Sequence, residues 1–443
     1  MISCQTEDEA KSYLQLAIEI SQKKDASPEE LTKAAAYLKS SADFGLNEAQ
    51  YVYGLWLLLG KSDCVTKDES KAAHYFKLSA DSGNANSQYN VGLCYLTGKG
   101  TQIDPKEALH YFELAAEQGH VQSQFKAGEM YRDSLGTTDK NGNERKSAFY
   151  FKDAADRGLA AAQAEYAKCL RDGFGVRKNP TEARKYFILS ANQKNHDSEF
   201  NLGVIYLNEG DIRSALPYFE RAANGGNHHA QMSLSKLYDQ GIGVESDSSL
   251  SYKYLKMAAD SGSSEAEYFL GFCLKQGKYK RECSCENVSE VDLANRYFKM
   301  AADNGFVHAQ LSVAEDCKEK GDIENAIKYY SLAVSQNNPV AKFMLGVLLL
   351  ENGKESQGAV LVQSGADDHI GEAQLTYAKY LLKKIAKKED EEKFVYYLKA
   401  AADNNNREAI ELYIQCLENG FCVEKNIKEA QRYHEKLLSL PTH

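Results

Sequence analysis

The sequence contains little of what several other classes of protein depend on. Only 6 prolines and 1 tryptophan occur among its 443 residues, and the formal net charge at pH 7 is −10. So few prolines argue against a loop-rich all-β fold, in which turn residues recur at short intervals. The acidic balance argues against a general nucleic-acid-binding protein, because such a protein needs a positive field to attract phosphate groups.

Long apolar runs are missing as well. The longest, Tyr51–Leu59 and Phe343–Leu350, are too short to cross a bilayer core of about 30 Å, so we expect no membrane insertion. The N-terminus carries Glu7, Asp8 and Glu9 and lacks the basic start and apolar stretch of a secretory signal. Ten cysteines in a chain without such a signal are expected to stay reduced. These observations predict a soluble, intracellular protein of the cytoplasm.

Tyrosine is abundant, with 28 residues, and it recurs with a period. The motif Ala-Ala-x-x-Gly, followed five residues later by Gln, occurs at Ala115–Gly119, Ala154–Gly158 and Ala301–Gly305. We call the glycine of this motif the turn position and count each repeat from it. Ten steps between turn positions span 360 residues, an average of 36. The eleven turn positions are Gly45, Gly83, Gly119, Gly158, Lys194, Gly226, Gly262, Gly305, Asn337, His369 and Asn405.

Each repeat has the periodicity of two helices. In the first helix, a small residue stands four residues after every turn position and another stands nine after it in ten of eleven repeats. Tyr or Leu stands twelve after it, except at Cys317. In the second helix, a tyrosine stands eight before the next turn position in eleven of twelve repeats, with Leu361 as the exception. Such spacings gather side chains on one helical face, so we interpret the tyrosine stripe as core packing.

The ends of the helices carry signals of their own. Asp104, Pro105 and Glu107 combine an N-cap, a proline in the first turn and an acidic residue at the third helical position. Glycine at most turn positions suits a left-handed residue after a helix, where an ordinary residue costs roughly 1–2 kcal/mol. Asn337 and Asn405 are the substitutes best tolerated in that conformation.

Neither helix can bury its apolar stripe alone, whereas stacked pairs bury a continuous core. The sequence therefore predicts an all-α fold, a right-handed α/α superhelix (solenoid) of about 11–12 helix-turn-helix repeats of roughly 36 residues. We expect a divergent N-terminal repeat or cap in residues 1–45 and the repeat array in residues 46–405. Residues 406–443 would form the last repeat and the C-terminal cap.

These motifs resemble those of the Sel-one-like repeat family, a relative of the tetratricopeptide repeats. The helix motif is shown by Leu202–Tyr206, and the loop motif Gly-x-Gly-Val by Gly173–Val176 and Gly241–Val244. The resemblance covers about residues 30–440 and implies protein–protein scaffolding with varied partners. Three features depart from the family pattern. Steps of 32 residues lose the long loop, residues 339–369 are degenerate, and the regular cysteine pairs of secreted relatives are missing.

Motifs that would carry chemistry are weak. Gly98–Thr101 lacks the spacing of a phosphate-binding loop, and we interpret it as a repeat loop. Cys283 and Cys285, in the insertion Lys278–Val291, have no second cysteine pair or nearby histidine, which makes them a poor zinc site. The cysteines that recur eleven residues after a turn position are expected to be small buried side chains. We therefore predict no enzyme activity, no cofactor and no metal site.

A basic groove is a further prediction. By analogy with tetratricopeptide arrays, positions 3, 6, 10, 13 and 14 after the turn position would line a concave face. Cations there would suit an acidic segment or a C-terminal carboxylate of a partner peptide. Acidic residues such as Asp133 and Asp172 share this face, so a mixed solvated surface stays open as the alternative. The candidate groove residues are Arg132, Lys168, Arg171, Lys236, Lys275 and Lys318.

The function expected from these features is that of a non-enzymatic scaffold or adaptor that binds a partner protein or peptide in the groove. The alternative is a regulatory subunit that controls an enzyme, such as a kinase or a ubiquitin ligase, on another chain. The sequence does not decide the identity of the partner, the pathway or the oligomeric state.

Overall fold

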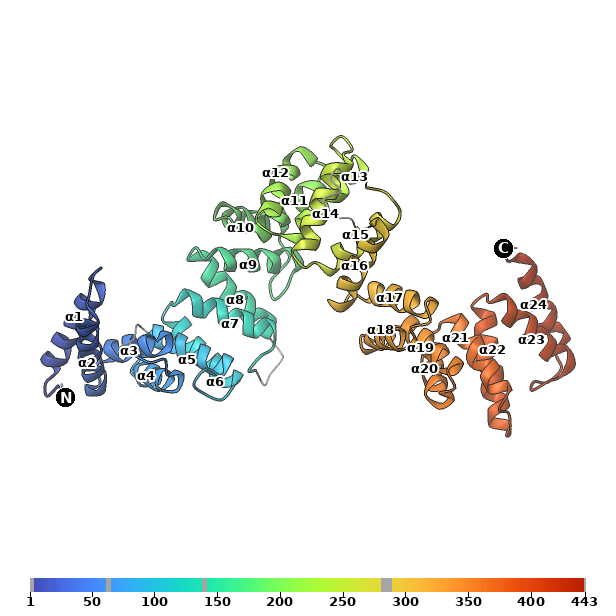
Figure 1. The fold of residues 1–443 in the computed structure, drawn as a ribbon, viewed down its shortest axis with the longest axis horizontal. Coiled ribbons are helices and arrows are strands. Elements are labelled where there is room, and N and C mark those ends of the chain that lie inside the picture. The colour runs from blue at the N-terminus through green and yellow to red at the C-terminus, as the bar shows by residue number, and fades with distance from the viewer. Residues whose placement is uncertain (1–3, 61–64, 138–141, 280–288, 442–443) are drawn as a thin grey trace. The chain divides into compact units, whose positions relative to one another are not determined.

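The computed structural model describes residues 4–60, 65–137, 142–279 and 289–441, and within these ranges the chain forms 24 α-helices and no strand (Figure 1). The helices group into two compact units, Met1–Asn227 and His228–His443.

The helices of the first unit are α1 Glu7–Gln22, α2 Pro28–Phe44, α3 Asn47–Leu59, α4 Glu69–Asp81, α5 Ala85–Thr97, α6 Pro105–Glu117, α7 Val121–Arg132, α8 Asn143–Asp156, α9 Ala160–Asp172, α10 Pro180–Asn192, α11 His196–Asn208 and α12 Ile212–Asn224. Those of the second unit are α13 His228–Gln240, α14 Ser248–Asp260, α15 Ser264–Lys275, α16 Glu290–Asp303, α17 Val307–Glu319, α18 Ile323–Ser335, α19 Pro339–Glu351, α20 Glu355–Asp367, α21 Gly371–Leu382, α22 Lys388–Asp403, α23 Arg407–Asn419 and α24 Ile427–Ser439.

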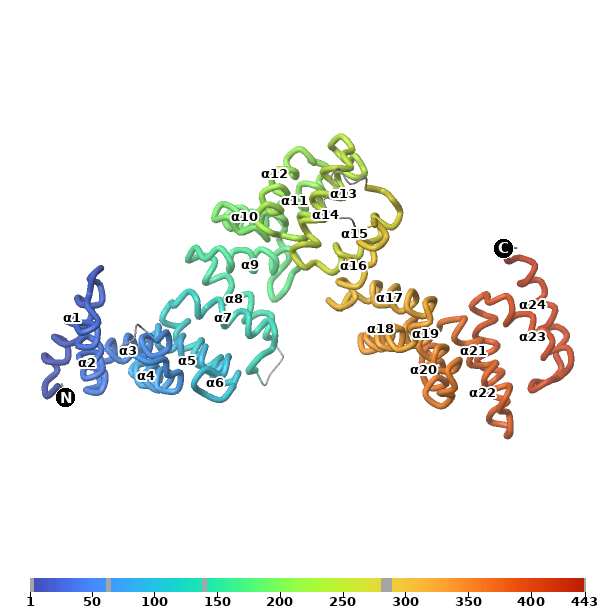
Figure 2. Tube along the Cα trace, in the orientation of Figure 1, coloured from blue at the N-terminus to red at the C-terminus, as the bar shows by residue number. Residues whose placement is uncertain are grey.

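Consecutive helices pair into hairpins, and the hairpins stack in sequence order within each unit (Figure 2). An odd-numbered helix packs on the even-numbered helix that follows, and the next hairpin packs on that pair. This is the architecture of an α-solenoid, in which each repeat contacts only its neighbours. The all-α repeat fold is confirmed, and α1 with α2 adds one more hairpin ahead of the eleven repeats. The domain boundaries at residues 45 and 405 stay predictions.

The turn positions end the second helices as predicted. All eleven have a left-handed backbone, with φ from 57° at Asn337 to 105° at Gly45. At Gly83 the backbone N–H donates to the carbonyl of Ala80 at 2.9 Å, and the next N–H, of Asn84, donates to the carbonyl of Ser79 at 3.2 Å. These bonds satisfy carbonyls that the helix end leaves open and turn the chain into the next repeat.

Several hairpins are held by close contact between a small residue and an aromatic ring. The small residue four after the turn position is completely buried in all eleven repeats. Nine after it, a Cβ added to Gly128 on α7 would lie 2.7 Å from a ring carbon of Phe151 on α8. The same approach recurs for Gly54 with Phe76, Gly92 with Phe112 and Gly203 with Phe219.

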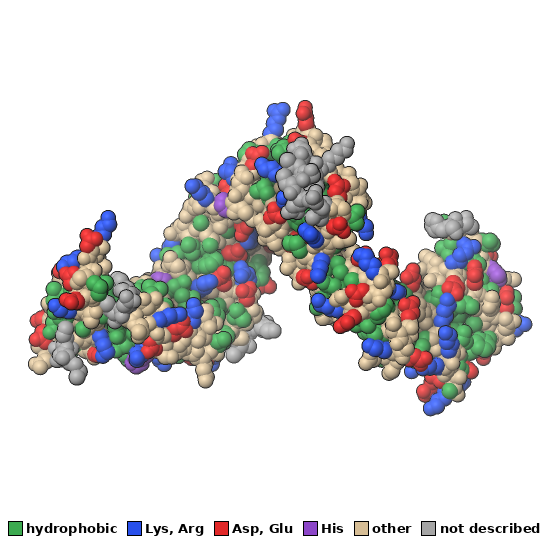
Figure 3. Space-filling model, viewed as in Figure 1, with side chains coloured by type: hydrophobic (Ala, Val, Ile, Leu, Met, Phe, Trp, Pro, Cys, Tyr) green, Lys and Arg blue, Asp and Glu red, His purple; other side chains and the backbone are tan. Residues whose placement is uncertain are grey.

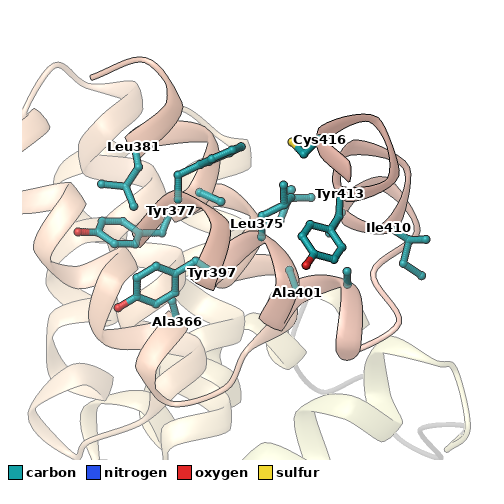
Figure 4. Packing of buried hydrophobic residues seen from close by; sticks show 14 of the residues in the cluster. Ala366, Leu375, Tyr377, Leu381, Tyr397, Ala401, Ile410, Tyr413 and Cys416 are labelled. Carbon is teal, nitrogen blue, oxygen red and sulfur yellow. The ribbon is translucent and has the colours of Figure 1, made fainter. Parts of the chain in front are cut away.

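The tyrosines of the stripe do more than fill the core. Figure 4 shows Tyr377 and Tyr397 facing each other, and their rings meet edge to face with centroids 4.9 Å apart. The hydroxyl of Tyr397 also donates to Asp367 of the preceding hairpin at 2.7 Å. Burial and this bond raise the pKa of Tyr397. The same bond to an aspartate two residues before the preceding turn position joins Tyr75 to Asp43, Tyr111 to Asp81, Tyr186 to Asp156, Tyr329 to Asp303 and Tyr433 to Asp403.

Side-chain amides form a second link between hairpins. The glutamine five residues after the turn position donates back to the carbonyl three before it, as Gln88 does to Ala80 at 3.3 Å. Its oxygen accepts from the amide one residue before the next turn position, as from Gln118 at 2.7 Å. The pattern repeats for Gln163 with Gln193, Gln310 with Gln336 and Gln374 with Asn404. The repeated Gln of the motif is therefore structural.

Two repeats carry Glu instead of this Gln. Glu199 is buried and paired, since Arg221 and His196 each lie 2.8 Å from it. Glu267 is 1% exposed, and both of its oxygens lie 3.0 Å from the side-chain amide nitrogen of Asn304. Burial raises the pKa of Glu267, because a carboxylate loses its hydration there without a cation to replace it.

Phe112→Ala is expected to cost about 3–5 kcal/mol of local stability, because it removes a completely buried ring that packs on Gly92. The control is Phe149→Ala on α8, whose side chain is 57% exposed. Thermal unfolding followed by circular dichroism compares the two. A melting temperature unchanged by Phe112→Ala would show that the assigned register is wrong.

Glu267→Gln is expected to raise the melting temperature at pH 7, because Gln restores the amide pattern of the other repeats. A carboxyl group whose pKa is raised on folding favours the folded state below its unfolded pKa, near 4.3, and that contribution is lost as pH rises through the folded pKa. The gain from Gln should therefore shrink as pH falls toward 4. Glu265→Gln, at an exposed position of the same helix, is the matched control. A gain that does not change with pH would contradict the account.

Candidate peptide-binding surface

The six predicted groove cations are divided between the two compact units. Arg132 ends α7, and Lys168 and Arg171 lie on α9, all in the first unit. Lys236 on α13, Lys275 on α15 and Lys318 on α17 belong to the second unit. The structure brings Arg132 and Lys168 together, because both contact one carboxylate of α9. Whether the six residues form one binding groove stays a prediction.

In the first unit the three cations are paired with acids. Glu165 lies 3.0 Å from Nη1 of Arg132 and 2.8 Å from Nζ of Lys168. Arg171 contacts Asp172 at 2.7 Å, which lowers the pKa of that carboxyl, and donates to Asn201 at 2.6 Å. Figure 3 shows basic and acidic side chains interspersed on the face in view. Exposed pairs of this kind are worth less than about 1 kcal/mol each, so a ligand can replace them at modest cost.

In the second unit one cation is paired and two are not. Lys318 lies 3.3 Å from Glu351. Lys236 and Lys275 are exposed and form no ion pair with any residue that the structure describes.

Lys275 borders an open recess of about 690 Å³ between the hairpin α15–α16 and the hairpin α17–α18, which we call the α15–α18 recess. Apolar groups form much of its wall, among them Tyr268 and Phe272, and Phe272 is 44% exposed. Its charged residues are Lys275, Lys299, Lys328, Asp316 and Asp322. A volume of this size suits a small ligand or a few side chains of a peptide.

Two other hollows differ in character. A recess of about 300 Å³ between α21, α22 and α23 is almost wholly apolar, with Leu375, Leu412 and Phe421 in its lining. A hollow of about 620 Å³ in the first unit is polar, with Asp156 and Glu182 in its lining. The α15–α18 recess combines the two features, because it has aromatic walls and a charged rim.

The described residues offer little for catalysis or metal binding. Burial raises the pKa of Cys94 to about 11 and that of Cys169 to about 12, so these thiols stay protonated at neutral pH. Across the parts of the chain that the structure describes, no three His, Cys, Asp or Glu side chains gather as a metal site would require. Cys283 and Cys285 lie outside the described residues. Of the described helices, none has both the length and the apolar character needed to span a bilayer.

Four of the positions predicted to line a groove lie in the wall of the recess, whereas the wall formed by second helices was not predicted. Positions 6, 10, 13 and 14 after Gly262 are Tyr268, Phe272, Lys275 and Gln276, and all four line the recess. Lys299 on α16 and Lys328 on α18 were missed, because only first-helix positions were considered. The sequence feature that could have indicated the recess is the spacing of only 32 residues between Gly305 and Asn337, because this spacing predicts a hairpin without a long loop.

Nine segments of the chain match the family model described as Sel1 repeat: residues 47–84, 85–120, 121–159, 160–195, 196–227, 228–263, 264–306, 308–338 and 415–440. The first seven matches begin two residues after a turn position, where the first helix of each repeat begins. The matched segments leave out residues 339–414, which include the repeat predicted to be degenerate.

Parts of this chain are similar in sequence to parts of two curated proteins. The mouse DAP3-binding cell death enhancer 1 is 33% identical over 150 residues, which are 32% of this chain and 29% of that protein. Chitin synthase regulatory factor 3 of Schizosaccharomyces pombe is 31% identical over 131 residues, 28% of this chain and 14% of that protein. The chain thus spans less than a third of the length of either relative.

A solved structure has the same fold. The crystal structure of c5321, a protective antigen of uropathogenic Escherichia coli strains with a Sel-one-like repeat (SLR) fold, superposes on this chain with a TM-score of 0.53 at 24% identity. The superposition covers 91% of this chain and 86% of that one. The matched segments of the family model make up more than half of the sequence. With its repeated motif, its left-handed turn positions and its stacked hairpins, this chain belongs to the Sel1 repeat family.

Proposed function

We propose that this protein is a non-enzymatic adaptor of the cytoplasm that holds a partner protein through the exposed face of its first helices. Sel1 repeat proteins generally mediate protein–protein interactions. The observation that carries the proposal is the exposed aromatic ring of Phe272 beside the ammonium group of Lys275, which forms no ion pair with a described residue. Phe272 does not stand alone, because it shares the wall of the recess with Tyr268 and Val313, and a contiguous apolar patch with a polar rim marks a protein-binding surface.

The separation of buried packing positions from exposed positions along the first helix supports the same function. Positions 4 and 9 after the turn position pack the hairpin, whereas positions 10 and 13 project from it. On α15 these projecting positions are Phe272 and Lys275, and on α9 they are Lys168 and Arg171. The scaffold can therefore change its exposed side chains from repeat to repeat without any change to its core.

A regulatory subunit is the second candidate. One relative is named as a regulatory factor of chitin synthase, an enzyme on another chain. A regulatory subunit of this kind would bind and control an enzyme on another chain, such as a kinase or a ubiquitin ligase. The two candidates differ in stoichiometry, because a regulatory subunit is expected to purify with one enzyme in a fixed ratio and an adaptor with several partners.

The test is purification of the tagged chain from its native cells, beside a variant with Lys168, Arg171 and Lys275 changed to Glu. We expect a partner protein that binds the wild type to be lost from this variant. The matched control changes three exposed lysines of second helices, Lys77, Lys256 and Lys428, to Glu and alters the net charge equally. The proposal fails if both variants retain the same proteins as the wild type while their melting temperatures are unchanged.

A further inference from the structure

We propose that the α15–α18 recess binds a peptide segment of a partner protein in which one bulky apolar side chain is flanked by acidic residues. This inference rests on the proposed adaptor function and specifies the chemistry of one of its binding surfaces. Three features of the recess support it: an opening that equivalent hairpins close, an apolar wall and three exposed lysines that form no ion pair with the described residues.

The opening follows from a missing loop. In the first unit, the connection between α9 and α10 lies across the start of α8, where the carbonyl of Glu144 leaves no room for a Cβ on Gly175. The loops that contain Gly100 and Gly136 lie in the same way on the starts of α4 and α6. Between α17 and α18 only three residues intervene, Lys320–Asp322. No such loop extends from this hairpin to α16, and farther along that helix the side chains of Asn295, Phe298 and Lys299 line the recess.

A missing ring widens the opening. In four hairpins the tyrosine twelve after the turn position stacks on the stripe tyrosine of the same hairpin, with interplanar angles of 14°, 10°, 13° and 7°. In α17–α18 the corresponding residue is Cys317, so Tyr329 has no such ring beside it, and both residues line the recess. The four stacked pairs are Tyr95 with Tyr111, Tyr131 with Tyr150, Tyr206 with Tyr218 and Tyr238 with Tyr254.

A comparison within the chain shows how an equivalent opening is filled. The hairpin α11–α12 also has a three-residue connection. There Arg184 of α10 places its guanidinium 5.3 Å from the centroid of the Tyr206 ring and pairs with Glu209. The residues that correspond to Arg184 and Tyr206 in the second unit are Asn295 and Cys317, which are both much smaller. Two size reductions at one place therefore leave the recess open.

The positive charge at the rim of the recess favours acidic residues on either side of the apolar side chain of the peptide. Lys275, Lys299 and Lys328 are exposed, and within the described residues none of them forms an ion pair. The two acids of the recess are already engaged. Asp316 lies 2.6 Å from Lys320, and Asp322 caps α18 and accepts from the side chain of Asn325 at 2.7 Å. The ammonium group of Lys328 lies 5.0 Å from the centroid of the Tyr329 ring, a contact that leaves its charge uncompensated. The positive charge around an apolar centre complements carboxylates on either side of an apolar side chain.

The direct test is fluorescence anisotropy with labelled peptides of the form Asp-Glu-Gly-X-Gly-Glu-Asp, where X is Phe, Trp, Leu or Ala. Neutral counterparts carry Asn and Gln in place of the acids. We expect the full-length chain to bind at least one of the Phe, Trp and Leu peptides about tenfold more tightly than the Ala peptide. The neutral counterpart should bind about tenfold more weakly than the acidic peptide, and added salt should reduce this difference.

The matched variant is Cys317→Tyr, which gives α17 the residue that the four stacked hairpins already carry at this position. It is expected to fold, to keep or raise the melting temperature, and to weaken binding of the acidic peptide about tenfold or more by filling the recess. Changing Lys275, Lys299 and Lys328 together to Gln should abolish the preference for acidic peptides. Lys428→Gln on α24, which lines no part of the recess, should change nothing.

Three results would overturn the inference: no binding of any peptide to the wild type, equal binding of all four X peptides, or unchanged binding to a folded Cys317→Tyr variant. The adaptor function is judged separately, by purification from native cells. A partner that remains bound to the Cys317→Tyr variant in that experiment would move the binding surface elsewhere and leave the adaptor function in place. A chain that purifies with no partner at all would reject both.

Discussion

The contact on which most hairpins depend is the one between a small residue in the middle of the first helix and a large side chain of the second. Glycine in a helix interior costs up to about 1 kcal/mol relative to alanine, so it needs a reason to be there. Here the reason is the ring of Phe151, which lies against the backbone of Gly128 and is completely buried. Where the small residue is Ala167, the opposite Phe187 is still completely buried, so this pair accommodates one extra methyl group without exposing the ring.

This contact fixes the helix pair and leaves the rest of the first helix free to vary. Turn residues join one hairpin to the next. Hydrogen bonds from the side chains of tyrosines and glutamines link each hairpin to its neighbour. The exposed positions then carry whatever side chains a partner requires. The repeat departs from its own pattern at α15–α18, because a short connection and the small Cys317 leave a recess where four other hairpins carry stacked tyrosines. Function in this chain is therefore expected where the repeat departs from its own pattern.

Much of the fold could be predicted from the sequence, because its determinants are local and repeated eleven times. The left-handed turn positions include Lys194 and His369, which lack the conformational freedom of glycine and were identified by spacing alone. The links between hairpins could not be predicted. That Tyr397 reaches Asp367, or that Gln118 reaches Gln88, depends on how two repeats pack, and the spacing within one repeat does not contain this information.

The candidate site was harder to predict than the fold for a related reason. The groove predicted from charged residues of the first helices included Arg132 and Arg171. The structure shows both residues in contact with neighbouring acids. The recess arises from a short connection and the small Cys317, and its lysines on second helices lie at positions that the groove prediction did not include. The exception at Cys317 was visible in the sequence, but its consequence required the positions of α16 and α18.

The measurement that tests the central contact most directly is a double-mutant cycle between Gly128→Ala and Phe151→Leu, read by hydrogen exchange of the α7 and α8 amides. In the wild-type background, Ala is predicted to speed exchange despite its higher helix propensity, because its methyl group would overlap the ring. In the Phe151→Leu background the same change is predicted to slow exchange, because the ring is gone and only the propensity remains. If Gly128→Ala slowed exchange equally in both backgrounds, the contact between backbone and ring would not be what sets the spacing of the hairpin.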